Sequence, residues 1–114
     1  TKSIDIIKFI YDEFNKTSLS TNSIKKIASI DLKKDENGLK KASEFYETEF
    51  ITYSTKKIKK VENKFETSDF VKSIVGVGCV SEPCGYLASN KGKKILDKQI
   101  KKGITLSIWE EQNE

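Results

Sequence analysis

The segment 73–83, SIVGVGCVSEP, constrains the fold more than any other stretch of the chain. It passes from apolar residues through a Gly-x-Gly turn to Ser81, Glu82 and Pro83. Ser is a common helix N-cap, Glu complements the positive end of a helix dipole, and Pro suits a first turn that does not need its N–H. We therefore expect a tight turn that leads into a helix, with Ser81 as its N-cap.

The glycines of this turn allow the backbone to approach a neighbouring element or a bound anion closely. The full dinucleotide-binding fingerprint is absent, because no third glycine follows at the required offset. Taken alone, the stretch is more typical of a turn with a purely structural role, because glycine turns of this kind are common.

The length and composition of the chain indicate one globular domain. It has 114 residues, of which 36% are hydrophobic and 33% charged. No apolar run approaches the roughly 20 residues that a membrane span needs, and no signal-peptide pattern opens the chain. We expect a cytoplasmic protein that does not contact a membrane. Cys79 and Cys84 lack the spacing for a disulfide on one helix and the partners for a zinc site, so we expect two buried free thiols.

The charged residues narrow the chemistry. The formal net charge is +4, every basic residue is a lysine, and there is no histidine. Arginine is the usual side chain for reading guanine and clamping phosphate, so its absence argues against a nucleic-acid partner. The absence of histidine removes the commonest general base and metal ligand. Any catalysis would depend on Lys, Glu, Asp, Ser, Tyr or backbone groups.

Hydrophobic periodicity predicts helices and strands that alternate along the chain. The predicted helices lie near 3–15, 36–47 and 81–89, with short ones at 55–61 and after Ser68, and the predicted strands near 26–31, 49–53, 94–98 and 104–109. This alternation implies parallel strands covered by helices on both faces, and the closing hairpin makes the sheet mixed. We therefore expect an α/β fold, a three-layer α/β/α sandwich on a mixed, mainly parallel sheet. The predicted core includes Ile7, Ile30, Leu39, Ile51, Val77, Leu87 and Ile108.

Two motifs, IASIDLKKDENGL at 27–39 and VGVGCVSEP at 75–83, together resemble the C-terminal domain of the cobalamin biosynthesis protein CbiG and its stand-alone relative CobE. That family has a strand ending in Thr/Ser-x-Asp-Leu-Lys, a Glu and a Gly-Leu that open a helix, and later a Val-Gly-Val-Gly-x-Val-x-Glu turn. The resemblance covers essentially the whole chain. The matching positions are Asp31, Lys33, Glu36, Gly38, Leu39, Ser54, Ser68, Val71, Gly76, Gly78, Val80, Glu82, Lys98 and Gly103.

The start of the chain departs from the family pattern. The family domain opens with a strand and a Gly-x-Gly-Cys-basic-basic-Gly-Thr turn, of which only Thr1 is represented. We therefore expect residues 1–114 to be a single CobE/CbiG C-terminal-like domain from a longer, two-domain protein. The first strand of the family domain would then lie outside this sequence.

The resemblance implies a role in the anaerobic pathway of cobalamin biosynthesis. The family enzyme, cobalt-precorrin-5A hydrolase, opens the ring-A δ-lactone of its substrate and releases acetaldehyde to give cobalt-precorrin-5B. Because the substrate itself carries the cobalt, the resemblance implies no resident cofactor and no protein metal site. The implied partners are this cobalt corrinoid and other enzymes of the pathway. The alternative is a non-catalytic, CobE-like module that binds or delivers a corrinoid, with the hydrolytic groups on another domain.

Lactone hydrolysis needs a positioned water, a base, and donors for the oxyanion. The candidate bases are Glu36 and Glu82, and the candidate substrate-binding residues are Asp31, Lys33, Gly76, Gly78, Ser81 and Lys98. The segment 31–36 follows a predicted strand, and α/β sheets bind ligands at the carboxyl ends of their strands. The alternative is structural, because a glutamate in a first helical turn stabilises the helix without any chemistry. The lysines of 91–102 would either attract a polycarboxylate or only be solvated.

Overall fold

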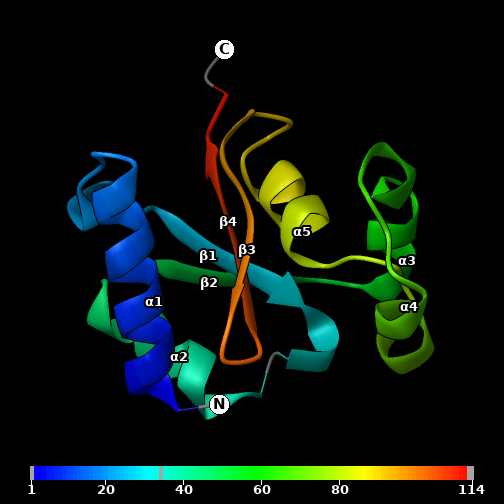
Figure 1. The fold of residues 1–114 in the computed structure, drawn as a ribbon, viewed down its shortest axis with the longest axis horizontal. Coiled ribbons are helices and arrows are strands. Elements are labelled where there is room, and N and C mark those ends of the chain that lie inside the picture. Colours follow the sequence, from blue (N-terminus) through cyan, green and yellow to red (C-terminus); the bar gives the residue numbers. More distant parts are fainter. Residues whose placement is uncertain (1, 34, 113–114) are drawn as a thin grey trace.

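The structure is a computed structural model that describes residues 2–33 and 35–112 (Figure 1). Its helices are α1 (Ser3–Lys16), α2 (Asn37–Phe45), α3 (Thr55–Lys59), α4 (Asp69–Val75) and α5 (Ser81–Ala88). Its strands are β1 (Lys26–Ile30), β2 (Glu49–Tyr53), β3 (Lys93–Lys101) and β4 (Ile104–Glu110). Short 3₁₀ turns, η1 (Thr21–Ser23), η2 (Asp31–Lys33) and η3 (Glu62–Lys64), connect them.

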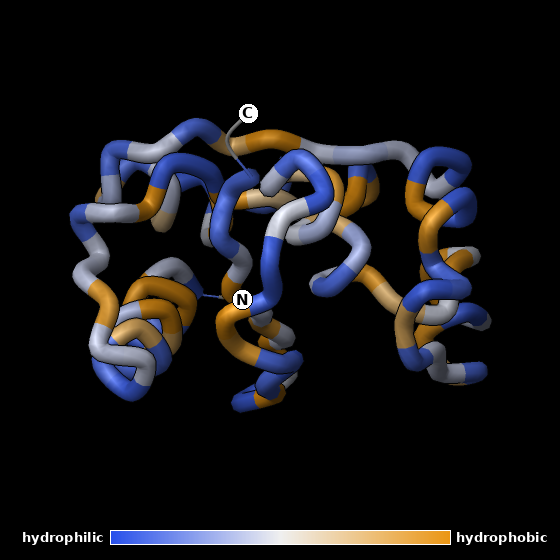
Figure 2. The backbone as a smooth tube through the Cα atoms, turned by 90° about the horizontal axis from the view of Figure 1, so that it is seen from above, coloured by the Kyte–Doolittle hydropathy of each residue, from blue (hydrophilic) through white to orange (hydrophobic). Residues whose placement is uncertain are grey.

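The strands lie between two groups of helices. In Figure 1, α1 and α2 lie on one side of the strands, and α5, with α3 and α4 beyond it, lies on the other. In Figure 2 the helices carry both hydrophobic and hydrophilic segments, as expected for amphipathic helices that bury one face. This arrangement confirms the α/β fold and its layers.

The strands form two hydrogen-bonded pairs. β1 and β2 are parallel, with Lys26 opposite Glu49 and Ile30 opposite Tyr53. β3 and β4 form an antiparallel hairpin. Within the described residues each pair is a separate two-stranded sheet. The parallel and antiparallel pairings were therefore predicted correctly, but the prediction that all four strands share one mixed sheet was wrong for these residues. A groove of about 370 Å³, lined by residues of both β1 and β4, lies between the two pairs.

The hairpin is longer and tighter than the sequence indicated. We expected a loop over 99–103, but β3 continues to Lys101 and only Lys102 and Gly103 form the turn. Their φ angles are +51° and +75°, as in the type I′ turn that matches the twist of a hairpin. Glycine adopts this conformation without steric cost, and the lysine tolerates it at an exposed tip.

Two hydrophobic clusters form the core. In the first, α1 and α2 pack against β4 through Ile6, Ile10, Phe14, Ala42 and Ile108. The second joins Ile30, Ile58, Val77 and Cys84 where β1, α3, the glycine turn and α5 meet. Of the predicted core residues, Ile30, Val77 and Ile108 are buried, and Ile7, Leu39, Ile51 and Leu87 are half-buried.

Side-chain caps fix the starts of two short helices. Ser54 Oγ accepts a hydrogen bond from the backbone amide of Lys57 at 3.1 Å, and Ser68 Oγ accepts one from that of Val71 at 3.4 Å. Each serine satisfies an amide that would otherwise have no partner at the start of α3 or α4. Short helices were predicted from the sequence at both places, at 55–61 and after Ser68.

Candidate functional site

The candidate site lies at the carboxyl ends of the parallel strands. Ile30 and Tyr53, the last residues of β1 and β2, pack in one cluster with Val77 of the glycine turn and Cys84 of α5. Asp31 begins η2 directly after β1, and its side chain is exposed. The fold thus brings the two sequence motifs, far apart in the chain, to the edge of the sheet where α/β proteins bind ligands.

The glycine turn is closed by the chain's own groups. Gly76 ends α4 with a φ of +85°, a left-handed conformation that favours glycine. The amide of Gly78 donates to Glu62 Oε2 at 2.9 Å, and its carbonyl accepts from the amide of Ser68 at 2.7 Å. A Cβ at Gly78 would lie 2.5 Å from Thr67 Cβ, so the glycine is needed for close approach. The carboxylate at this turn is the chain's own Glu62, which accepts a hydrogen bond from the amide of Gly78.

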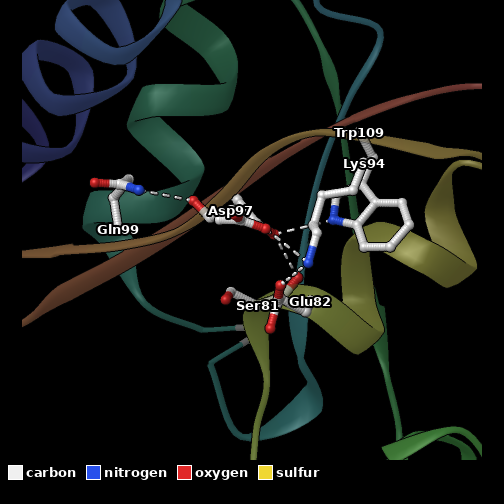
Figure 3. A network of polar contacts seen from close by, with 7 residues as sticks. Ser81, Glu82, Lys94, Asp97, Gln99 and Trp109 are labelled. Carbon is white, nitrogen blue, oxygen red and sulfur yellow. Dashed lines mark hydrogen bonds and ion pairs between the residues drawn. The ribbon is translucent and has the colours of Figure 1, made fainter. Parts of the chain in front are cut away.

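Glu82 lies in the first turn of α5 and is only 6% exposed. Figure 3 shows how Lys94 of β3 bridges Glu82 and Asp97: Lys94 Nζ lies 2.7 Å from Glu82 Oε2 and 2.9 Å from Asp97 Oδ1. The hydrogen bond to Asp97, followed by that to Glu82, raises the pKa of the Lys94 ammonium. Lys94 is therefore held charged between two carboxylates, and Glu82 serves as an ion-pair partner as well as a helix-start charge.

Ser81 is the first residue of α5, and the N-cap is Val80, which makes no side-chain cap bond. The prediction that Ser81 caps this helix is therefore wrong, because the helix begins one residue earlier than expected. The buried hydroxyl of Ser81 has no hydrogen-bond partner among the described residues. The Ser81 carbonyl accepts a hydrogen bond from Ser107 Oγ at 3.1 Å, and Trp109 Nε1 donates to that hydroxyl of Ser107 at 3.1 Å.

Lys33 and Glu36 form an ion pair just beyond the end of β1. Lys33 Nζ lies 3.5 Å from Glu36 Oε2, and the side chains are 53% and 21% exposed. Glu36 is the N-cap residue of α2 and makes no side-chain cap bond, while its amide donates to the carbonyl of Lys33 at 3.0 Å. The loop therefore presents a cation and a carboxylate side by side, both with access to solvent.

The two cysteines are free and buried, as predicted. Burial, followed by the charges of Glu62 and Glu82, raises the pKa of the Cys79 thiol to about 11, and Lys98 acts in the opposite direction. Burial also raises the pKa of Cys84 to about 12. The charges of Glu62, Glu82 and Lys98 therefore all act on the Cys79 thiol. Lys98 is half-buried and makes no hydrogen bond or ion pair within the described part of the chain.

The comparison with protein families shows to which family the chain belongs. The model of the family described as "Cobalamin synthesis G C-terminus" matches residues 1–109. The chain belongs to this family.

Two curated relatives are named cobalt-precorrin-5A hydrolase. The protein from Salmonella typhimurium is 33% identical over 86 residues, which cover 75% of this chain and 24% of the relative. The protein from Priestia megaterium is 31% identical over 108 residues, which cover 95% of this chain and 29% of the relative. The chain thus spans only 24% and 29% of the length of these relatives.

The fold also matches a solved structure. CobE, a protein from the cobalamin (vitamin B12) biosynthetic pathway, superposes with a TM-score of 0.85 over 94% of this chain and 82% of CobE. At 15% sequence identity, this likeness establishes the shared fold.

Sequence reasoning about this cobalamin synthesis G C-terminal domain missed Glu62 and Lys94 as site residues. Glu62 lies in a polar connection without hydrophobic period, and Lys94 is one of several lysines in 91–102. Their partners, Gly78 and Glu82, lie 16 and 12 positions away, so no local pattern reports the contacts. Among the described residues, no group of three or more His, Cys, Asp or Glu side chains is placed to hold a metal ion. Within the same residues no helix is long and apolar enough to cross a membrane.

Proposed function

We propose that this domain is the C-terminal part of a hydrolase of cobalamin biosynthesis that acts on cobalt-precorrin-5A. Family membership supports the pathway, and the names of both curated relatives support the reaction. In the proposed reaction, water adds across the ring-A δ-lactone of the substrate, and acetaldehyde leaves to give cobalt-precorrin-5B. The cobalt arrives with the substrate.

The observation that carries the proposal at residue level is the ion pair between Lys33 and Glu36, 3.5 Å apart at the carboxyl end of β1. A carboxylate with solvent access is suited to accept a proton from a water molecule, and a neighbouring ammonium stabilises the oxyanion that forms at the lactone carbonyl. We assign Glu36 as the base and Lys33 as the group that binds a substrate oxygen.

Glu82 suits a different role. Its side chain is only 8% exposed and is bound by Lys94 at 2.7 Å, so a water molecule has little access to it. A buried carboxylate whose charge is already paired is better placed to hold Lys94 and the start of α5 in position. We therefore propose Glu82 as a positioning residue and Glu36 as the catalytic one.

The lysines of the site give the proposal an electrostatic component. A corrinoid precursor carries several carboxylates. Lys98 is half-buried, its charge acts on Cys79, the residue after Gly78, and it has no ion-pair partner among the described residues. Lys98 and Lys33 would each attract a substrate carboxylate. Asp31, which is exposed, would orient a neutral hydrogen-bonding group of the same ligand, whereas the hydroxyl of Ser81 is buried and is not given this role.

The test uses the full-length protein and cobalt-precorrin-5A. Acetaldehyde release is followed by coupling it to an alcohol dehydrogenase and recording the loss of NADH. Glu36→Gln is expected to preserve substrate binding and to slow release by roughly 10²-fold, the usual scale for loss of a general base. The matched control is Glu44→Gln, an exposed glutamate on the same helix, which should leave the rate unchanged.

The same experiment separates hydrolysis from delivery. If Lys33→Ala weakens corrinoid binding but Glu36→Gln and Glu82→Gln both leave acetaldehyde release unchanged, the domain only binds or delivers the corrinoid. If Lys33→Ala weakens corrinoid binding and Glu36→Gln slows acetaldehyde release, both results together support the hydrolase function.

A further inference from the structure

Tyr53 is an ionisable residue at the candidate site that the proposed reaction does not yet use. It is the last residue of β2 and lies opposite Ile30, the last residue of β1. It packs against the second hydrophobic cluster, which joins β1, α3, the glycine turn and α5. The turn η2, which carries Lys33, lies beside the same strand. Tyr53 therefore stands at the carboxyl ends of both parallel strands, where α/β sheets bind ligands.

The hydroxyl of Tyr53 is available to a ligand. The residue is half-buried, and its hydroxyl makes no hydrogen bond among the described residues. In that part of the chain only Ser81 Oγ is a buried side-chain polar atom without a hydrogen bond, so the Tyr53 hydroxyl retains access to solvent. Lys57 Nζ lies 5.3 Å from the centroid of the Tyr53 ring. This cation–π contact orients the ring and leaves its hydroxyl unused.

The other tyrosines are placed differently. The hydroxyl of Tyr46 donates to the carbonyl of Ile7 at 2.6 Å. Tyr86 packs edge-to-face against Trp109, and Tyr11 is 52% exposed on α1. The structure describes all four tyrosines of the chain, and only the one at the end of β2 combines a strand-end position with a hydroxyl that a ligand can reach.

The surroundings of Tyr53 keep its hydroxyl protonated. Burial, followed by the influence of Cys84 and Glu49, raises the pKa of the phenol above its ordinary value of 10.0. At neutral pH the group is therefore a hydrogen-bond and proton donor, not a base. A phenol is nevertheless far more acidic than an aliphatic alcohol, so it can protonate an alkoxide oxygen as that oxygen leaves a carbonyl carbon.

Lactone opening calls for such a donor. The oxygen that leaves the acyl carbon is an alkoxide, a poor leaving group unless it receives a proton as the bond breaks. Glu36 is already assigned to accept a proton from water, and Lys33 to bind a substrate oxygen. The chain has no histidine that could serve as both base and acid. The two proton transfers are therefore assigned to two different side chains.

We propose that Tyr53 is the general acid of the lactone opening, a role that rests on the proposed hydrolase function. The oxygen of water bonds to the acyl carbon as Glu36 takes one proton of that water. The bond between the acyl carbon and the ester oxygen then breaks, and the ester oxygen keeps the electron pair and takes the proton of the Tyr53 hydroxyl. The phenolate recovers, through solvent, the proton that Glu36 holds. The net change is the addition of one water molecule.

The test uses the full-length protein and cobalt-precorrin-5A, with acetaldehyde release followed by the coupled alcohol dehydrogenase. Tyr53→Phe removes only the hydroxyl and should slow release by about 10²-fold. Corrinoid binding, measured by visible absorbance, and the far-UV circular dichroism spectrum should stay unchanged. Tyr11→Phe is the matched control, since that hydroxyl lies on the exposed side of α1, and it should leave the rate unchanged.

A second measurement separates proton donation from packing. Replacement of Tyr53 by 3-fluorotyrosine keeps the shape of the ring but makes the phenol more acidic. The variant should retain activity at neutral pH, and its kcat/KM should begin to decline at lower pH than that of the parent, because the donor loses its proton sooner. A tyrosine that only packs would not move this alkaline limb.

The outcomes distinguish this role from the function on which it rests. If the parent protein releases acetaldehyde and Tyr53→Phe releases it equally fast, the assignment of Tyr53 is overturned and the hydrolase function stands. An alkaline limb that 3-fluorotyrosine does not shift, or a Tyr53→Phe variant that loses corrinoid binding in place of rate, would also overturn it. If the parent protein releases no acetaldehyde, the hydrolase function itself fails, and the role of Tyr53 as an acid fails with it.

Discussion

The carboxylate of Glu62 accepts a hydrogen bond from the amide of Gly78 at 2.9 Å, across 16 positions of the chain. The contact joins η3, an outlying turn, to the glycine turn that precedes α5. Together with the bond from the Ser68 amide to the Gly78 carbonyl, it fastens the α3–α4 segment to the candidate site through both backbone groups of one residue. The shape of the site therefore depends on a segment that contributes no predicted catalytic group.

Glu62→Ala is expected to lower the free energy of unfolding by about 1–3 kcal/mol, because it leaves the buried Gly78 amide without its charged acceptor. Glu62→Gln keeps an acceptor oxygen and should cost less. Urea unfolding followed by far-UV circular dichroism measures both. Glu66→Ala is the control, since Glu66 is exposed and lies close by in the sequence. An equal loss in the Glu62 and Glu66 variants would show that the bond contributes nothing specific.

The sequence predicted what local periodicity controls. The helix at 3–15 and the strands at 26–31 and 49–53 were found within a residue or two, because each shows a clear hydrophobic period. The boundary of α5 was wrong by one residue, since Ser81 suits both the cap and the first turn. Contacts between residues that are far apart in the chain could not be predicted, because they produce no local sequence pattern.

The site shows the same division. The two motifs approach each other where Ile30, the residue before Asp31, packs with Val77 of the glycine turn. The contacts of individual residues in these motifs could not be predicted from their spacing in the sequence. Glu82 forms a buried ion pair with Lys94, and the amide of Gly78 donates to the carboxylate of Glu62.

The ion pair of Glu82 and Lys94 predicts strong coupling between their substitutions. Lys94→Met should destabilise the protein by about 2 kcal/mol, because it leaves a buried carboxylate without its cation. Glu82→Gln should cost a similar amount. The double variant removes both charges and should cost clearly less than the sum of the two. A double-mutant cycle measured by urea unfolding gives the coupling free energy. Additive losses would mean that the 2.7 Å contact is energetically neutral.

Gly78→Ala is expected to destabilise the domain by about 1–3 kcal/mol, because the new Cβ would lie 2.5 Å from Thr67 Cβ. The steric origin has its own test. Adding Thr67→Gly removes the side chain that the new methyl group meets, and should restore part of the lost stability. Gly103→Ala is a useful comparison, since nothing lies within 4 Å of its position and its cost would come only from the φ of +75°. Absence of any rescue by Thr67→Gly would contradict the steric explanation.

The buried thiols predict a characteristic response to alkaline pH. The pKa is about 11 for Cys79 and about 12 for Cys84, against an ordinary value of 9.0, and burial is the main cause for both. A raised thiol pKa means that the folded state keeps its proton when the unfolded state has already lost it. The contribution to stability is therefore complete below pH 9 and falls as pH rises from 9 towards 12, by up to about 1.4 kcal/mol per pH unit for each thiol.

Cys84→Ala tests this linkage. The variant should be less stable than the parent chain at pH 7 because it leaves a small cavity, but its stability should fall less steeply between pH 9 and 10.5. Urea unfolding across this pH range gives the two slopes, and lysines and tyrosines that titrate in both proteins cancel in the difference. As a second measurement, Ellman's reagent at pH 8 should react slowly with the folded chain and quickly in urea, because the thiolate is both scarce and inaccessible in the fold. Fast labelling of the native protein, or identical pH slopes, would mean that the thiols are not protected by burial.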